Sequence, residues 1–185
     1  MYNNPVSFIK VTTNEVIDFI ASAKKRIIFA KPSFFKNEIE AIIDTKYQED
    51  IFVEIYMEAG ESAIRYGFGE TSALELISAN IGLFDTHLAD RIRIAILIVD
   101  NNALVYMPNL SFIEEESNAL TFPNGFLCNE DVTEDIFRQF TARNSDNIIM
   151  EKLENVLFFP GVNILSLNND DAVINNMESS IKNLR

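Results

Sequence analysis

In the first half of the chain, short apolar runs alternate with segments in which apolar residues recur at helical spacing. An apolar run predicts a short buried strand at residues 26–30, and an alternating run rich in β-branched and aromatic residues predicts a second strand at residues 51–57. Helical spacing predicts three helices, whose expected N-cap residues are Thr13 and Asn14, Ser33, and Thr71 or Ser72. Strands that alternate with helices indicate a mostly parallel sheet with helices packed against it.

The following residues predict another strand and then a hairpin. Residues 83–87 are a candidate strand, and residues 91–99 form a long apolar strand. Asp100-Asn101-Asn102 predicts a tight turn, after which residues 103–107 return as the antiparallel partner until Pro108. The hairpin makes the sheet mixed, so the expected fold class is α/β, with a mixed sheet flanked by helices.

After Pro108 the pattern is weaker. Residues 114–116 are an acidic run, which we interpret as a solvated loop or helix start rather than a metal site. Residues 130–142 predict a helix with one apolar face. Residues 148–165 are rich in apolar side chains, and residues 172–184 predict a short C-terminal helix.

The length of 185 residues and the hydrophobic fraction of 48% fit one domain with a full core. We expect an α/β core at residues 1–110 and an extension at residues 111–185 that packs on or continues the same domain. The net charge of −13 gives an acidic surface that repels phosphate backbones and anionic lipid heads. This charge disfavours nucleic acid and membrane surfaces as partners, and it suits a basic protein partner.

Cys128 is the only cysteine of the sequence, so no disulfide can form within one chain. The N-terminal residues lack a basic segment followed by an apolar run, which argues against a signal peptide. The longest apolar stretch, residues 94–99, is too short to span a bilayer. We therefore expect a cytoplasmic protein in which Cys128 is a buried or half-buried thiol rather than a nucleophile.

Two segments carry a likeness to a known family. The basic cluster Lys24-Lys25-Arg26 leads into an apolar strand, and the segment 91–101 is an apolar strand that ends in Asp100-Asn101. In this order, over residues 11–107, the chain resembles the phospholipase D superfamily. The resemblance implies a phospholipase-D-like α/β fold and a catalytic strand of the form His-x-Lys-x4-Asp, followed by a hairpin and a Gly-Ser pair.

The family motif is degenerate in this chain. Anchored on Asp100, it places Arg93 at the histidine position and Ala95 at the lysine position. The Gly-Ser pair falls on Met107-Pro108. In the family, one histidine attacks phosphorus, a second acts as general acid and base, and lysines stabilise the phosphate charge. Arginine stays protonated at neutral pH and cannot be that nucleophile, so the resemblance argues against the usual activity.

His87 is the only histidine of the sequence, and it has two interpretations. It is a surface or turn residue, or it replaces the missing catalytic histidine. Arg91 and Arg93 alternate with isoleucines and are expected on one face of their strand. Arginines on an inner face need partners, and the candidates are Asp85, Asp90 and Asp100. Alternatively, Arg93 retains a ligand-binding role at the position of the family's catalytic histidine.

The segment from Arg65 to Gly69 precedes a predicted helix and makes an anion pocket conceivable. Glycine lets a backbone approach a ligand closely, and helix N-termini favour anions. The candidate anion-binding residues are Arg65, Tyr66, Gly67, Gly69 and Arg93. The spacing matches neither a dinucleotide fingerprint nor a P-loop, and an ordinary loop with turn glycines is the simpler interpretation.

Three carboxylates flank the same loop: Glu58, Glu61 and Glu70. The carboxyl ends of strands are where α/β sheets place their sites, so a metal could bind there. Histidine and cysteine are nearly absent, however, and solvated loop charges are the simpler interpretation. We expect neither a metal nor a cofactor.

These observations favour a non-catalytic interaction or regulatory domain. A homodimer is expected, because catalytic members of the family pair two such domains face to face and this chain carries one. A further protein partner is the other expectation. The alternative is a phosphodiesterase or nuclease of altered mechanism, in which Arg65 and Arg93 bind phosphate and His87 or a metal-bound water attacks, with Asp100 as the surviving motif residue.

Overall fold

A computed structural model describes residues 5–58, 61–88, 92–108 and 123–145 of the chain. Three expectations fall outside these residues: the acidic run at 114–116, the apolar-rich stretch at 148–165 and the helix at 172–184. The described elements, in chain order, are β1 (Val6–Ile9), α1 (Thr13–Ala21), β2 (Arg26–Ala30), α2 (Lys36–Gln48), β3 (Phe52–Met57), α3 (Glu61–Arg65), α4 (Thr71–Ala79), the 3-10 turn η1 (Ile81–Leu83), β4 (Asp85–Leu88), β5 (Ala95–Val99), β6 (Asn102–Tyr106), β7 (Gly125–Cys128) and α5 (Glu130–Ser145).

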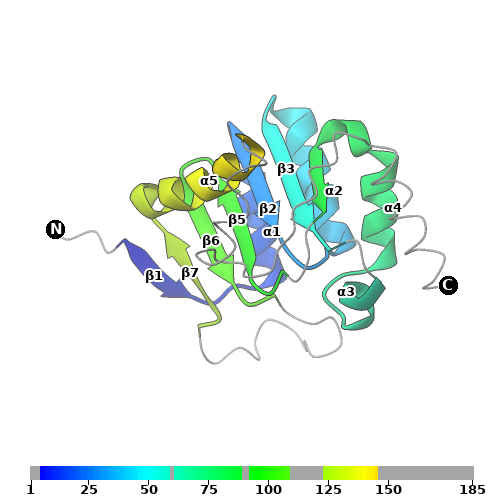
Figure 1. The fold of residues 1–185 in the computed structure, drawn as a ribbon, viewed down its shortest axis with the longest axis horizontal. Helices are drawn as coiled ribbons and strands as arrows, with labels where there is room; N and C mark the ends of the chain where they lie inside the picture. Colours follow the sequence, from blue (N-terminus) through cyan, green and yellow to red (C-terminus); the bar gives the residue numbers. More distant parts are fainter. Residues whose placement is uncertain (1–4, 59–60, 89–91, 109–122, 146–185) are drawn as a thin grey trace.

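The strands form one seven-stranded sheet in the order β1-β7-β6-β5-β2-β3-β4. β2, β3 and β4 are parallel, and the remaining neighbours are antiparallel. Figure 1 shows α1, α2 and α4 on one side of the sheet and α5 on the other. The predicted mixed sheet with flanking helices is therefore confirmed. β7 and α5 follow residue 110. β7 is a strand of this sheet, and α5 packs against one of its faces.

Two hydrophobic clusters hold the layers together, one on each face of the sheet. The larger cluster joins β2, β3 and β5 to α1, α2 and α4, and its buried residues include Ile20, Ile42 and Ile77. The smaller cluster joins the other face of the same strands to α5 through Ile136. Every residue of β5 is buried, because both of its faces are covered. Each fully buried aliphatic side chain contributes about 1.5–3 kcal/mol.

The helix starts differ from the predicted ones by a few residues. α1 is capped by Thr12, whose side chain accepts from the Glu15 amide while the Glu15 carboxylate accepts from the Thr12 amide. The expected cap Ser33 lies too far upstream, because α2 begins only at Lys36. The free amides at the start of α2 donate to two carboxylates instead. Glu38 Oε2 accepts from the Phe35 amide at 2.8 Å, and Glu70 Oε1 accepts from the Lys36 amide at 2.6 Å.

The predicted hairpin is confirmed, but its first strand is shorter than expected. Val99 pairs with Asn102, so the turn consists of Asp100 and Asn101, with Asp100 at φ 52°. β5 begins at Ala95 rather than at Arg91, and Arg93 therefore precedes the strand instead of lying in it. No helix in the described part of the chain is long and apolar enough to cross a membrane.

Candidate functional site

A group of polar side chains lies along β3 and at its carboxyl end. Glu54, Tyr56 and Glu58 occupy alternate positions, and each contacts a residue from another element. Their contacts from β4 and from the segment before β5 are His87 and Arg93. We call these five residues the β3 polar column. It runs toward the carboxyl ends of the parallel strands, where α/β folds place their sites.

Glu54 is the buried centre of the column, with 4% of the residue exposed. The Tyr56 hydroxyl donates to Glu54 Oε1 at 2.6 Å. His87 Nε2 lies 2.8 Å from the same oxygen, and the His87 and Tyr56 rings stack with 4.5 Å between their centroids. β3 and β4 are paired so that Tyr56 lies opposite His87, and this register brings the two rings together.

The structure contradicts the surface interpretation of His87. The residue lies within β4, and 13% of its side chain is exposed. Its Nδ1 is buried without a hydrogen-bond partner among the described residues. A carboxylate beside one imidazole nitrogen orients the ring and leaves the other nitrogen to accept or donate a proton. The Glu54 carboxylate and the Tyr56 ring together hold the imidazole in place at the edge of the sheet.

Arg93 lies at the open end of the column. Its Nη1 donates to Glu58 Oε1 at 2.8 Å and to the Ile92 carbonyl at 3.0 Å, and 65% of its side chain is exposed. The sequence suggested Asp85, Asp90 or Asp100 as partners, but the acceptor is Glu58. The reason is geometric: Arg93 precedes β5, next to the segment that follows β3, instead of facing into the sheet. Arg91 and Asp90 lie outside the described residues.

Asp100, which the resemblance aligns with the aspartate of the family motif, is hydrogen-bonded to the backbone. Its carboxylate accepts from three consecutive amides, those of Lys24, Lys25 and Arg26, at 2.8–3.0 Å. Its own carbonyl accepts from Arg26 Nε at 3.0 Å. These bonds fix the β5–β6 turn against the start of β2, so the carboxylate has a structural role.

The loop after α3 has a structural reason for each of its glycines. Gly67 has φ 82°, a left-handed conformation that favours glycine. A Cβ at Gly69 would lie 2.5 Å from the Phe34 carbonyl oxygen and 2.5 Å from Ser33 Oγ. The backbone of the loop therefore packs against the segment between β2 and α2. Arg65 is the last residue of α3, and Tyr66 is 65% exposed.

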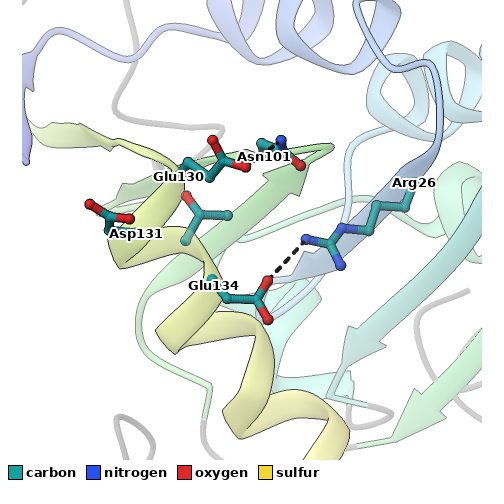
Figure 2. A pocket seen from close by; sticks show the side chains of 6 residues that line it. Arg26, Asn101, Glu130, Asp131 and Glu134 are labelled. Carbon is teal, nitrogen blue, oxygen red and sulfur yellow. Dashed lines mark hydrogen bonds and ion pairs between the residues drawn. The ribbon is translucent and has the colours of Figure 1, made fainter.

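The candidate metal-binding carboxylates are used in other ways. Glu58 binds Arg93 and Glu70 binds the start of α2, while the side chain of Glu61 lies outside the described part. Within the described ranges, no group of three or more histidine, cysteine, aspartate or glutamate residues is arranged to hold a metal ion. A pocket does form at another place, beside the start of α5 (Figure 2), and it contains none of the candidate anion-binding residues.

Two buried polar features were missed in the sequence. Glu54 stands between Val53 and Ile55 in an apolar strand, and a carboxylate at such a position signals a buried partner. Lys31 and Glu38 form a buried ion pair, with Nζ 2.7 Å from Oε1 and 2.9 Å from Oε2. They are seven positions apart, with Lys31 just after β2 and Glu38 in α2, so their contact leaves no local pattern in the sequence.

Comparisons with known proteins give no match in sequence and several in structure. No protein-family model matches the chain, and no curated protein does. Phosphatidylserine synthase from Haemophilus influenzae Rd KW20 superposes with a TM-score of 0.58 at 11% identity, over 100% of this chain and 44% of that protein. Nuc from Salmonella typhimurium, a phospholipase D family member, superposes with a TM-score of 0.51 at 18% identity. The match covers 75% of this chain and 91% of Nuc.

A third similar structure is TrmBL2, described as an archaeal chromatin protein with a novel mode of DNA binding. It superposes with a TM-score of 0.50 at 13% identity, and the match covers 76% of this chain and 51% of that protein. The chain thus matches about half of TrmBL2 and less than half of the phosphatidylserine synthase. Identities this low relate the folds alone. The seven-stranded mixed sheet with its flanking helices is a phospholipase-D-like α/β fold.

Proposed function

We propose that this chain is a non-catalytic phospholipase-D-like interaction or regulatory domain. The observation that carries the proposal is which residues align with the catalytic histidine and lysine of the family motif, and what surrounds them. Arg93 stands at the histidine position and is ion-paired with Glu58, and Ala95 stands at the lysine position and is fully buried. A guanidinium remains protonated and cannot attack phosphorus, and a buried methyl group cannot stabilise a phosphate.

The position of the one histidine also supports this proposal. His87 lies on β4, at the opposite edge of the sheet from β1, and its Nε2 is beside the Glu54 carboxylate. A two-histidine mechanism needs two imidazoles at one phosphorus. His87 is bound within its own domain by Tyr56 and Glu54, which suits a role in the fold.

A protein partner agrees best with the charge of the chain. The net charge of −13 repels the phosphates of nucleic acids and anionic lipids. The DNA binding described for TrmBL2 is therefore not extended to this chain. A partner with a basic surface would be attracted instead. Capture of partners from the source cells, with the net charge of the captured proteins compared with that of the proteome, tests this part of the proposal.

A homodimer is part of the proposal, since catalytic members of the family place two such domains face to face. Native mass at micromolar concentration tests it directly. A mass of twice 21.0 kDa supports the dimer, and monomer alone contradicts it without affecting the non-catalytic assignment.

The alternative is a phosphodiesterase or nuclease of altered mechanism, and one observation favours it. Arg93 is 65% exposed at the end of the β3 polar column, so its guanidinium retains donors for a phosphate oxygen. Arg65 would supply a second cation, and His87 would act as base. Under this alternative, Arg93→Ala abolishes turnover. In a non-catalytic domain, the same substitution changes only stability or ligand affinity.

A further inference from the structure

The pocket beside α5 lies where the first turns of this helix meet the start of β2 and the β5–β6 turn (Figure 2). Its volume is about 290 Å³. Six residues line it: Arg26, Asn101, Glu130, Asp131, Thr133 and Glu134. The lining holds three carboxylates and one guanidinium, so the pocket carries a net negative charge.

Arg26, the cation of the pocket, is already engaged by the protein. Its Nε donates to the Asp100 carbonyl at 3.0 Å, and its guanidinium carbon lies 3.8 Å from the centre of the Phe137 ring. Its Nη2 is 3.9 Å from Glu134 Oε2. An anionic ligand would have to compete with this carboxylate and approach two others. The charge balance therefore favours a cation.

The carboxylates at the rim keep free acceptor oxygens. Glu130 Oε1 accepts from Asn101 Nδ2 at 2.8 Å, which leaves Oε2 available to a ligand. Asp131 is exposed and makes no hydrogen bond or ion pair with any described residue. Acidic residues at the start of a helix are stabilised by the helix dipole, which is sufficient to explain why they occur here. The dipole does not explain why a pocket lies between them.

Thr133 is the second and independent feature that points to a ligand. It lines the pocket with 1% of the residue exposed, and its Oγ1 has no hydrogen-bond partner among the described residues. Buried hydroxyl groups are nearly always hydrogen-bonded in folded proteins. A donor group of a ligand that reaches this oxygen from the pocket would satisfy it.

We propose that the pocket binds an alkylammonium or alkylguanidinium group, presented by a protein partner as a lysine or arginine side chain. The volume is just below the range of about 300–1,000 Å³ that is typical of small-molecule sites, and it suits one long side chain. Within the described ranges, no cluster of His, Cys, Asp or Glu side chains suits a metal ion. The proposal rests on the proposed interaction function and names the chemistry of the partner.

Titration of the full chain with a short capped peptide at low salt tests this proposal. The probe contains one central arginine between glycines, and its control contains citrulline, which has the same shape without the charge. Chemical-shift changes in NMR spectra locate and quantify binding. The test variants are Asp131→Asn, which is exposed, and Thr133→Val, which keeps the buried shape. The matched control is Asp135→Asn, which makes the same charge change on an exposed residue of the same helix that does not line the pocket.

We expect the arginine peptide, but not the citrulline peptide, to shift resonances around the pocket. Either test substitution should weaken binding about tenfold, whereas the control stays within about twofold. Asp131→Asn removes a negative charge that faces the cation, and Thr133→Val removes a hydrogen-bond acceptor. No saturable binding to the wild type overturns the proposal. An equal loss in Asp131→Asn and Asp135→Asn indicates attraction by overall charge and also overturns it. Tighter binding of free spermidine than of the peptide assigns the pocket to polyamines and contradicts a protein partner.

The two proposals can fail separately. Hydrolysis of a phosphodiester by the wild type would contradict the non-catalytic assignment, whether or not the peptide binds. Absence of both hydrolysis and peptide binding would leave the interaction function and remove only this pocket as the place where the partner docks.

Discussion

The imidazole of His87 stacks on the phenol ring of Tyr56, with an angle of 17° between the ring planes and Nε2 2.8 Å from Glu54 Oε1. This arrangement gives the single histidine of the chain its contacts within the sheet. The register of β3 and β4 places the two rings opposite each other, and the buried Glu54 carboxylate accepts from Tyr56 and lies beside His87. His87 is therefore a structural part of the sheet edge in the proposed function.

Tyr56→Phe should lower the free energy of unfolding by about 1–2 kcal/mol, because it removes a donor from the buried Glu54 carboxylate. Chemical denaturation followed by circular dichroism measures the change. Tyr66→Phe is the matched control, since Tyr66 is 65% exposed, and it should change stability by less than about 0.5 kcal/mol. Equal effects of the two substitutions would contradict the structural role of the Tyr56 hydroxyl.

Asp100→Ala should lower stability by about 2 kcal/mol. The substitution removes the acceptor of three backbone amides and places alanine at φ 52°. Asp100→Asn should have a smaller effect, because asparagine tolerates this conformation and keeps one acceptor oxygen. Asp50→Ala, at a fully exposed carboxylate, is the control. An Asp100→Ala protein as stable as the wild type would contradict the structural role of the Asp100 carboxylate.

Glu38→Leu should destabilise the chain by about 3 kcal/mol or more, because it leaves the Lys31 ammonium buried without its closest carboxylate. The double substitution Lys31→Met with Glu38→Leu should be more stable than Glu38→Leu alone, since it removes the ammonium that the single substitution leaves buried. Lys36→Met removes an exposed pair with Glu40 and should change stability by less than about 0.5 kcal/mol. Additive effects of the Lys31 and Glu38 substitutions would show that the two charges are not coupled.

Cys128 should react slowly with thiol reagents in the folded protein. Burial raises the pKa of the Cys128 thiol above its ordinary value of 9.0, which lowers the thiolate fraction at neutral pH. The unfolded chain releases this proton first as the pH rises, so the free energy of unfolding falls above about pH 9, the ordinary pKa of the thiol. Cys128→Ala should remove that part of the fall. Rapid modification by a disulfide reagent at pH 7 would contradict the buried position.

Much of the fold could be predicted from local patterns. The runs that became β2, β3 and β5 are apolar, and the two-residue turn at Asp100 and Asn101 marks the hairpin. β1 was missed, because Val6–Ile9 is a short edge strand with partly exposed side chains and no strong alternation. Its place is fixed by pairing with β7, more than a hundred residues later in the chain.

The site was harder to predict, because its contacts join residues that are distant in the sequence. The resemblance drew attention to Arg93, but its partner Glu58 is 35 positions away and follows a different strand. Gly69 suggested close approach to a ligand, whereas its closest neighbours are Phe34 and Ser33 of the same chain. Sequence spacing reports which residues share an element, and it does not report which elements meet.

The most direct test of the central claim is hydrolysis of bis-p-nitrophenyl phosphate at high protein concentration, with and without divalent metal. Wild type, Arg93→Ala and the exposed control Arg138→Ala are compared, so that a contaminating enzyme is recognised by equal rates in all three. The account predicts no turnover above that of heat-denatured protein under any condition. Turnover by the wild type and by Arg138→Ala that disappears in Arg93→Ala would contradict it and make the degenerate motif an active site of altered mechanism.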